Sequence, residues 1–449
     1  MINDTICAIA TPFGTGGISV IRVSGPEAIL KVNQTFKGRN LLSVNTHTIH
    51  YGHIISELGE IVDEVMISVM HAPKTFTAEN VVEISTHGGV LVTQKVLERL
   101  LELDIRLANP GEFSERAYLN GRIDLVEAEA IMDVISAKNE QALKIANLGV
   151  AKQTSKLVYD LREKLLNIIA NIEVNIDYPE YDDAVTMSEE IVEPQVKKLL
   201  KEIDHLLKHS YQTRLIREGI KTAIIGRPNV GKSSLLNTLL DEDKAIVTNI
   251  AGTTRDTIDA YVNIGGITLH LIDTAGIRET LDVVEQIGVG KSKKALEEAE
   301  LVLLVIDQSE DLTKEDLELL ELTKNKKRII ILNKSDLNKS KVKLADSISI
   351  STLTSDGIDK LEQEIIKTLQ LEDLNNSDFN FLSNARHIQK VKEAKTSLES
   401  VLEAINNEMP VDIYAIDLTN AWNMLGDIIG VRYEDELIDQ LFSKFCLGK

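Results

Sequence analysis

The pattern of hydrophobic and polar positions over the first 118 residues combines short strand-like runs with one helical run. Three stretches rich in Val and Ile are bounded by Gly, Pro or Asn, which predicts strands at ISVIRVSG, DEVMISVM and NVVEIST. The stretch GGVLVTQKVLERLLE instead has helical spacing, with apolar residues at Val92, Val96, Leu97, Leu100 and Leu101. Together these runs predict an α+β module.

The pattern changes to that of long helices from about Asp124 to Arg217, where Gly and Pro are almost absent. Residues 219–372 then alternate strand-like and helical runs, which is typical of a doubly wound parallel sheet. After the polar linker EDLNNSD, helical patterns return from about Ala385 to Phe445. Because helices stand on both sides of the α/β unit, we expect that unit to be inserted into one helical bundle, as domains with neighbouring ends allow.

Composition narrows the class of protein. Hydrophobic residues make up 43% and charged residues 27% of the 449 residues, as expected for a folded chain of about two or three domains. The formal net charge of -21 means that the surface as a whole does not attract nucleic acid, so any RNA contact must be local or supplied by a partner.

Cysteine usage and the N-terminal stretch bear on the compartment. The only two cysteines, Cys7 and Cys446, lie far apart, which argues against a disulfide framework. The stretch MINDTICAIATPFG lacks the basic and apolar regions of a signal peptide, and no run approaches the ~18 apolar residues that span a bilayer. We therefore expect a cytoplasmic protein.

The clearest chemical signal is a phosphate-binding loop. KTAIIGRPNVGKSSLL is a predicted strand, a Gly-rich loop and a helix, and it fits G-x-x-x-x-G-K-S from Gly226 to Ser233. Backbone N–H groups of the loop and the helix N-terminus form a concave anion site. Lys232 adds a charge at the β- and γ-phosphates, and Ser233 offers a hydroxyl to Mg²⁺.

Two switch-like stretches follow this loop in the expected order. TNIAGTTRD (248–256) occupies the place of a first switch, with Thr254 as the expected Mg²⁺ ligand. HLIDTAG (270–276) is expected to place Asp273 near the Mg²⁺ shell and the backbone N–H of Gly276 near the γ-phosphate.

A base-reading motif completes the set. RIIILNKSD (328–336) is a predicted strand that ends in Asn-Lys-x-Asp, and Asp336 can accept two hydrogen bonds from guanine that adenine cannot supply. The later stretch SISISTLTS has Ser351-Thr352 where such loops usually have Ser-Ala, so its base contacts are not defined by the sequence. The motifs predict nucleotide contacts from these residues: Asn229, Val230, Gly231, Lys232, Ser233, Ser234, Thr248, Asn249, Ile250, Ala251, Gly252, Thr253, Thr254, Asp273, Thr274, Ala275, Gly276, Asn333, Lys334 and Asp336.

Along its whole length the chain resembles the MnmE/TrmE family of tRNA-modification GTPases. Besides the GTPase motifs, the similar stretches are ATPFGTGGISVIRVSG, PGEFSERAYLNGRIDLVEAEAI and the terminal FCLGK, of which the last two are specific to that family. The resemblance implies a multi-domain α/β and α+β fold. Its parts are an α+β tetrahydrofolate-binding and dimerisation domain (1–119), a helical bundle domain in two parts (120–218 and 373–449), and an inserted P-loop, Ras-like G domain with a mostly parallel sheet (219–372).

The resemblance also implies an activity. The family hydrolyses GTP and, with the flavoprotein MnmG/GidA, forms an aminomethyl-type (carboxymethylaminomethyl) group at carbon 5 of the wobble uridine of certain tRNAs. It implies a homodimer through the N-terminal domain and the cofactors GTP, Mg²⁺, K⁺ and a one-carbon tetrahydrofolate in the 5-formyl or methylene form.

One position departs from the common GTPase pattern. The second switch often reads Asp-x-x-Gly-Gln, whose Gln orients the attacking water, but here Ile277 follows the glycine. An arginine finger from a partner is one replacement. The resemblance implies another, in which two G domains meet and K⁺ takes the place of the finger, held by Asn229, the backbone of Thr248 and Ile250, and Thr253.

The family match also gives Glu285 the role of positioning the water through a second water, with Lys232 as the other catalytic residue. From the residues alone, Glu285 would be a solvated charge on a helix face. With the match, the catalytic role is favoured.

The folate contacts implied by the resemblance are Arg22, Glu83, Arg122 and Lys449, with Cys446 near the same pocket. A pterin needs a carboxylate for its amino-pyrimidine edge, and the glutamate tail needs a cation. From the residues alone, Glu83 could equally be a strand-edge residue that faces water, since a buried unpaired carboxylate would be costly. Cys446 could be a nucleophile, a proton carrier or an inert packing residue.

Two other functions compete with this interpretation. A ribosome-assembly GTPase of the Era or Der type would carry an RNA-binding appendage or a second G domain, and neither is found in the sequence. A dynamin-like membrane machine would need a basic or amphipathic membrane-binding stretch, which the acidic composition disfavours.

Overall fold

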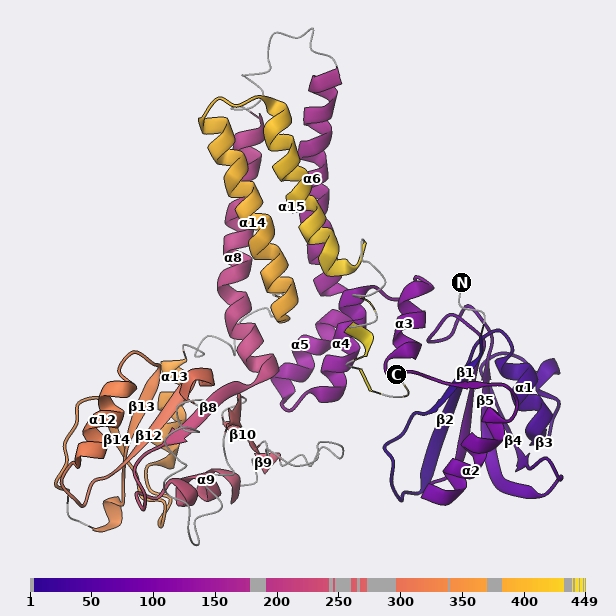
Figure 1. The fold of residues 1–449 in the computed structure, drawn as a ribbon, viewed down its shortest axis with the longest axis horizontal. Helices are drawn as coiled ribbons and strands as arrows, with labels where there is room; N and C mark the ends of the chain where they lie inside the picture. The colour runs from indigo at the N-terminus through magenta and orange to yellow at the C-terminus, as the bar shows by residue number, and fades with distance from the viewer. Residues whose placement is uncertain are drawn as a thin grey trace. The chain divides into compact units, whose positions relative to one another are not determined.

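The computed structural model describes residues 4–177, 191–241, 245–246, 260–264, 267–272, 296–337, 340–369 and 382–431, and positions 438, 441–443, 445–446 and 448. It divides into two compact units. One comprises residues 1–132, 149–178 and 415–449, and the other residues 133–148 and 179–414. Figure 1 shows the elements of both. Among the helices of the described ranges, none is long and apolar enough to cross a membrane.

The first unit contains a seven-stranded sheet in the order β3-β4-β5-β6-β2-β1-β7, antiparallel except for the β1–β7 pair. The strands predicted at β2, β5 and β6 and the helix α2 are confirmed. The elements are β1 Ile6–Ile9, β2 Ile18–Ser24, α1 Ala28–Thr35, β3 Phe36–Lys37, the 3-10 turn Leu41–Ser43, β4 Thr48–Ile55, β5 Ile61–Met70, β6 Val81–His87, α2 Val90–Leu101 and β7 Arg106–Leu107.

The two faces of this sheet differ in burial. Alternate strand residues on one face, such as Ile21, Ile67 and Ile84, form a core with Val96 and Leu100 of α2. The opposite face carries Arg22 and Glu83, which are register partners on β2 and β6. Because side chains alternate across a strand, this second face also holds a group of apolar side chains that are 47–67% exposed. We call it the open face, and its exposed apolar residues are Ile18, Ile49, Tyr51 and Met66.

Helices and the C-terminal segment complete the first unit. They are α3 Glu112–Leu119, α4 Leu125–Ser136, α6 Gln153–Asp177 and α15 Val411–Ile429. Arg162 of α6 stacks over Trp422 of α15 with its guanidinium carbon 4.1 Å from the ring centroid. Phe442 and Phe445 pack in one hydrophobic cluster with Ala117 of α3, so the end of the chain lies against α3.

The second unit contains a seven-stranded sheet in the order β14-β13-β12-β8-β11-β10-β9. The pairs are parallel except β10 with β11 and with β9, which confirms the predicted mostly parallel sheet. Alternate residues of β12 contribute to separate cores on the two faces, Leu303 and Val305 to one and Leu304 and Ile306 to the other. The elements are β8 Ile220–Ile225, α9 Lys232–Asp241, β9 Ala245–Ile246, β10 Ala260–Ile264, β11 Ile267–Leu271, β12 Leu301–Asp307, α12 Lys314–Leu322, β13 Arg328–Asn333, the 3-10 turn Ser335–Leu337, β14 Ser347–Ser349 and α13 Ile358–Thr368.

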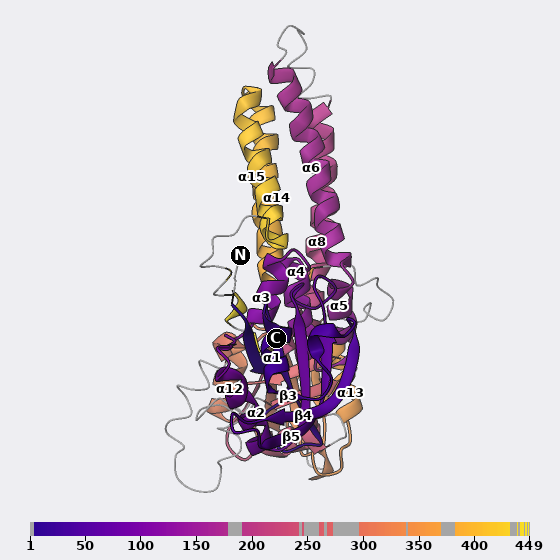
Figure 2. The same cartoon turned by 90° about the vertical axis from the view of Figure 1, so that its right-hand side faces the viewer.

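Long helices precede and follow this sheet in the sequence. α8 (Glu193–Glu218) comes before it and α14 (Ala385–Asn406) after it, and the two lie side by side in both views (Figures 1 and 2). Lys395 of α14 forms an ion pair with Asp204 of α8 at 2.8 Å. α5 (Glu140–Val150) adds Ile145 to the core beneath the sheet.

Candidate functional site

The phosphate loop joins the end of β8 to the start of α9. Two of its glycines have positive φ, +157° at Gly226 and +99° at Gly231. A Cβ atom at Gly226 would lie 2.3 Å from the carbonyl oxygen of Val305, and one at Gly231 would lie 2.2 Å from Nδ2 of Asn333. Only glycine fits this close approach of backbone to neighbours, so the motif's glycines are explained by packing as well as by conformation.

The side chain of Lys232 folds back over the phosphate loop. Its ammonium donates to the carbonyl oxygens of Gly226 and Arg227, both at 2.8 Å. A phosphate bound in the loop would compete with these carbonyls for the same cation. Ser233 and Ser234 occupy the first turn of α9, where N–H groups without helical partners favour an anion.

Asn229 stands at the tip of the loop. It is exposed and has φ +63°, a left-handed conformation that Asn tolerates better than most residues. Its amide oxygen is a neutral ligand of the kind that a weakly held monovalent cation accepts.

The base-reading motif follows β13 and is tied to the phosphate loop. Asn333 is fully buried, and its Nδ2 donates to the carbonyl of Val230 at 2.9 Å. The Oδ1 of Asn333 accepts from the backbone N–H of Thr352 at 3.2 Å. One amide therefore holds the phosphate loop and the loop after β14 at fixed positions relative to each other.

Lys334, the second residue of the motif, is held by Asp307 at the end of β12. Its φ is +68°, and its Nζ lies 2.6 Å from Oδ2 of Asp307. Burial alone would raise the pKa of Asp307, but hydrogen bonds from Lys334 and Ser309 outweigh burial and hold that pKa below its ordinary value. The lowered pKa favours the charged form of Asp307, which orients the lysine.

Ser351 supplies a contact that the sequence did not define. It is fully buried, and its hydroxyl donates to Oδ1 of Asp336 at 2.7 Å. Oγ of Ser351 in turn accepts from the backbone N–H groups of Leu353 and Thr354 at 3.3 and 3.2 Å. Threonine in place of the usual alanine at 352 leaves this serine contact in place.

Much of the predicted site lies outside the described residues. These positions are Thr248, Asn249, Ile250, Ala251, Gly252, Thr253, Thr254, Asp273, Thr274, Ala275, Gly276, Ile277, Glu285 and Lys449. Of the predicted Mg²⁺ ligands only Ser233, and of the predicted K⁺ ligands only Asn229, falls within the described part of the chain.

A second cluster gathers on the sheet of the first unit. Arg22 and Glu83 form an ion pair, with Nη2 and Oε1 2.8 Å apart. The guanidinium of Arg22 also lies over two aromatic rings, 5.6 Å from the centroid of Phe76 and 5.7 Å from that of Phe113. Its Nη1 donates to the carbonyl of Gly448 at 3.3 Å. The explanation of Glu83 as a strand-edge residue is wrong, because β6 lies between β5 and β2.

Arg122 reaches the same cluster from the turn after α3. Its Nε donates to the carbonyl of Thr75 at 3.0 Å, and its guanidinium carbon is 5.9 Å from the Phe76 centroid. The carbonyl of Cys446 accepts from the backbone N–H of Gly111 at 3.3 Å, and the cysteine itself is exposed. The structure thus brings Arg22 and Arg122 to one aromatic ring, and Arg22 connects that ring to Glu83 and to Gly448 near the end of the chain.

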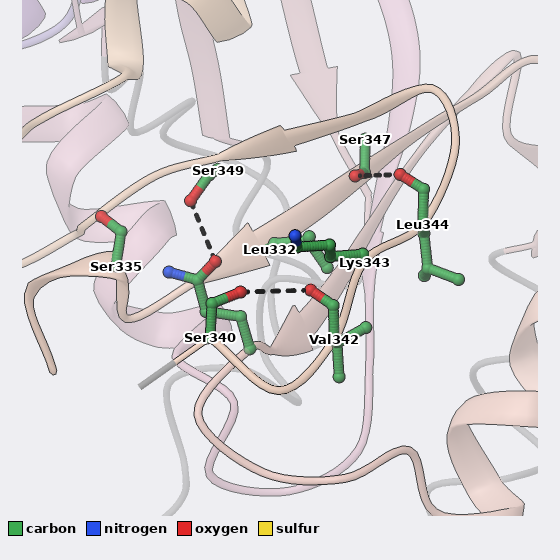
Figure 3. Close-up of a pocket in the computed structure, with 9 residues that line it drawn as sticks. Leu332, Ser335, Ser340, Val342, Lys343, Leu344, Ser347 and Ser349 are labelled. Carbon is green, nitrogen blue, oxygen red and sulfur yellow. Dashed lines mark hydrogen bonds between the residues drawn. The ribbon is translucent and has the colours of Figure 1, made fainter. Parts of the chain in front are cut away.

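A polar pocket of about 610 Å³ lies beside the base-reading motif (Figure 3). Three of its hydroxyls bond within the pocket: Ser349 donates to the Gln308 side chain at 3.0 Å, and Ser340 and Ser347 donate to the carbonyls of Val342 and Leu344. A second pocket of about 460 Å³ is lined by residues 227–229 of the phosphate loop and by Thr313, Lys314 and Glu315.

Two family descriptions cover most of the chain. "GTP-binding protein TrmE N-terminus" matches residues 5–122, and "MnmE helical domain" matches residues 125–446. The chain belongs to the MnmE family. The resemblance inferred from the motifs is confirmed.

Relatives in the MnmE family align over nearly the whole chain. The tRNA modification GTPase MnmE of Acholeplasma laidlawii is 65% identical over 446 residues, which is 99% of each chain. The proteins of the same name from aster yellows witches'-broom phytoplasma and Streptococcus pyogenes serotype M4 are 55% and 54% identical. The alignment with the phytoplasma protein covers 100% of each chain. The alignment with the streptococcal protein covers 99% of this chain and 98% of the relative.

Proposed function

We propose that this MnmE-family chain hydrolyses GTP and that hydrolysis serves the modification of tRNA. The observation that carries the proposal is the connection between phosphate loop and base-reading loop. Asn333 holds Val230 in one loop, and Ser351 holds Asp336 in the other. Guanine offers two N–H donors on one edge, so a carboxylate fixed by a buried serine can select it over adenine.

We propose that the chain is organised as residues 1–119, 120–218 with 373–449, and 219–372. The last range would be the G domain, inserted into a helical domain. The side-by-side packing of α8 and α14, which enter and leave the inserted range, supports this division.

Metal ions would complete the nucleotide site. Mg²⁺ would be held by Ser233 and Thr254, and K⁺ by Asn229 with Thr248, Ile250 and Thr253. The exposed amide of Asn229 at the loop tip fits a cation that prefers neutral oxygens. K⁺ would supply positive charge where Ile277 supplies none. Lys232 would hold the phosphates, and Glu285 would position the attacking water.

The cluster around Phe76 fits a one-carbon tetrahydrofolate. Glu83 is 30% exposed and one of its oxygens is held by Arg22, so it can still accept from a pterin edge. Arg122 is exposed and can pair with a carboxylate of the glutamate tail. Lys449 and Cys446 belong to the same proposed pocket. When bound, the 5-formyl or methylene form would supply a one-carbon unit.

Two partners follow from the same proposal. A second copy of this chain would cover the open face, whose exposed Ile18, Ile49, Tyr51 and Met66 are an apolar group beside the Arg22–Glu83 pair. The flavoprotein MnmG/GidA would join the dimer to form the aminomethyl-type group at carbon 5 of the wobble uridine.

Nucleotide-dependent phosphate release from the purified full-length chain tests the hydrolysis. GTP should be hydrolysed and ATP should not, and Lys232→Ala should abolish release from GTP. Equal hydrolysis of GTP and ATP, or a Lys232→Ala variant with full activity, would contradict the proposed site. The alternative of a ribosome-assembly GTPase of the Era or Der type predicts that deletion leaves tRNA modification intact and changes ribosomal subunit profiles.

A further inference from the structure

Arg227 ties the phosphate loop to the start of α12. It is the first residue after Gly226, and its side chain is 16% exposed. Its Nη2 donates to Oε2 of Glu310 at 2.5 Å, and its Nε lies 3.3 Å from Oδ2 of Asp316. Both acids belong to the segment that forms the first turn of α12 and the loop before it.

Asp316, one of the two acids that Arg227 contacts, is itself held in place by hydrogen bonds. Asp316 is almost fully buried, and its Oδ2 accepts from the backbone N–H and the hydroxyl of Thr313 at 3.0 and 2.8 Å. Thr313 in turn caps the backbone N–H of Asp316, which completes a capping box at the N-terminus of α12. Nε of Arg227 forms no hydrogen bond with this carboxylate, so Asp316 attracts the guanidinium as a fixed, buried negative charge.

The backbone of Arg227 is connected to two residues of the nucleotide site, Lys232 and Asn229. The carbonyl of Arg227 is one of the two acceptors for Lys232. Pro228 follows, and it fixes its own φ and restricts the conformation of the residue before it. The anchored Arg227 therefore restricts the position of Asn229, which follows two residues later and has a positive φ.

We propose that Arg227 is a positioning residue: its tie to Glu310 and Asp316 holds residues 227–229 of the phosphate loop in the conformation that receives the phosphates of a guanine nucleotide. This inference rests on the proposed function. It gives α12 a direct part in nucleotide retention. It also gives a role to Arg227, which stands at the second position of G-x-x-x-x-G-K-S, where the pattern specifies no residue.

Dissociation of a fluorescent GDP analogue from the full-length protein tests the role. Arg227→Ala should release the analogue about tenfold faster, as expected when one charge-assisted tie is lost. Arg227→Lys should restore part of the retention, because an ammonium can reach one carboxylate but cannot serve both acids at once. Glu310→Gln should have a smaller effect, since Glu310 is 59% exposed.

A double-mutant cycle separates positioning from a general loss of stability. Asp316→Asn keeps an acceptor for Thr313 but removes the charge opposite Arg227, so combining it with Arg227→Ala should add little to the release rate. The control is Lys324→Ala, which breaks an exposed ion pair with Glu321 at the far end of the same helix region. That variant should release the analogue at the wild-type rate.

The outcomes distinguish this inference from the proposed function. A wild-type protein that binds no guanine nucleotide would overturn both. A wild type that binds, with Arg227→Ala and Arg227→Lys releasing within about twofold of it, would overturn the positioning role alone. Fully additive effects in the cycle would also overturn it, because Arg227 would then act without Asp316.

Discussion

Ser351 donates a hydrogen bond of 2.7 Å to Asp336, and both side chains come from loops that follow neighbouring strands of one sheet. This contact predicts that base selection depends on the serine as well as the aspartate. Asp336→Asn should weaken GTP binding on the order of hundredfold and favour xanthosine triphosphate, because the amide presents a donor where the carboxylate accepted. Ser351→Ala should weaken GTP binding about fivefold without a preference for xanthine.

Competition titrations with a fluorescent nucleotide measure both effects. Thr354→Ala serves as a control, because its hydroxyl bonds to exposed Asp356 rather than to Asp336. Wild-type GTP affinity in the Asp336→Asn variant would mean that another residue reads the base.

The Arg22–Glu83 pair predicts a folate site in the first unit. Glu83→Ala or Arg22→Ala should abolish binding of 5-formyl-tetrahydrofolate while leaving GTP affinity intact, because each removes a charge that the ligand would meet. Calorimetry measures folate binding directly. Lys95→Ala is the matched control, since it breaks an exposed ion pair with Glu98 on α2. Unchanged binding in both site variants would remove these residues from the site.

A buried charge network predicts how the stability of the first unit depends on pH. Burial alone would raise the pKa of Glu112, but hydrogen bonds from Arg106, the backbone of Asn109 and Arg116 hold that pKa below its ordinary value of 4.5. The pKa of Asp4 is lowered for the same reason, since Arg106 and Arg116 outweigh its burial. Their contribution to the free energy of unfolding is therefore complete above the ordinary pKa and is lost as the pH falls through the folded-state value.

Urea unfolding followed by Trp422 fluorescence measures this effect, because Trp422 is the only tryptophan and lies in the first unit. Glu112→Gln should lower the free energy of unfolding by about 3 kcal/mol at pH 7, since Arg116 loses a buried partner. It should also flatten the decline of stability below pH 4.5, the ordinary pKa of the carboxyl. A decline as steep as that of the wild type would show that other groups cause it. Glu102→Gln is the control, because Glu102 is an exposed carboxylate paired with Arg99.

The position of Asn229 predicts a dependence on the monovalent cation. Hydrolysis should be on the order of tenfold faster in K⁺ than in Na⁺ at equal ionic strength, because Na⁺ is too small for a cage sized for K⁺. Asn229→Ala should remove the difference while leaving GDP affinity nearly unchanged, since the ion would act mainly in the transition state. Equal wild-type rates in the two salts would direct attention to an arginine from a partner.

The sequence predicted the elements better than it predicted the contacts between them. Strands and helices follow local periodicity, so β2, β5, β6 and the mostly parallel sheet could be predicted from short windows. The ion pair of Arg227 with Asp316 joins residues almost ninety positions apart, and no local pattern marks it. Ser351 matches the first residue of the usual Ser-Ala pair, but Thr352 departs from the second, so the sequence left the base contacts of this loop undefined.

The surroundings of Glu83 show the same limit. Strand order brings it to its partner Arg22, and the sequence alone does not fix that order. The residue type indicated a carboxylate that needed a partner, but not which strand would supply one.

Mass spectrometry of wobble-position nucleosides tests the central claim most directly. We predict that cells lacking this protein lose the aminomethyl-type group at carbon 5 of the wobble uridine in certain tRNAs. The wild-type gene should restore the group, and the Lys232→Ala variant, expressed at the same level, should not. Normal wobble uridine modification in the deletion strain, or full restoration by Lys232→Ala, would contradict the account.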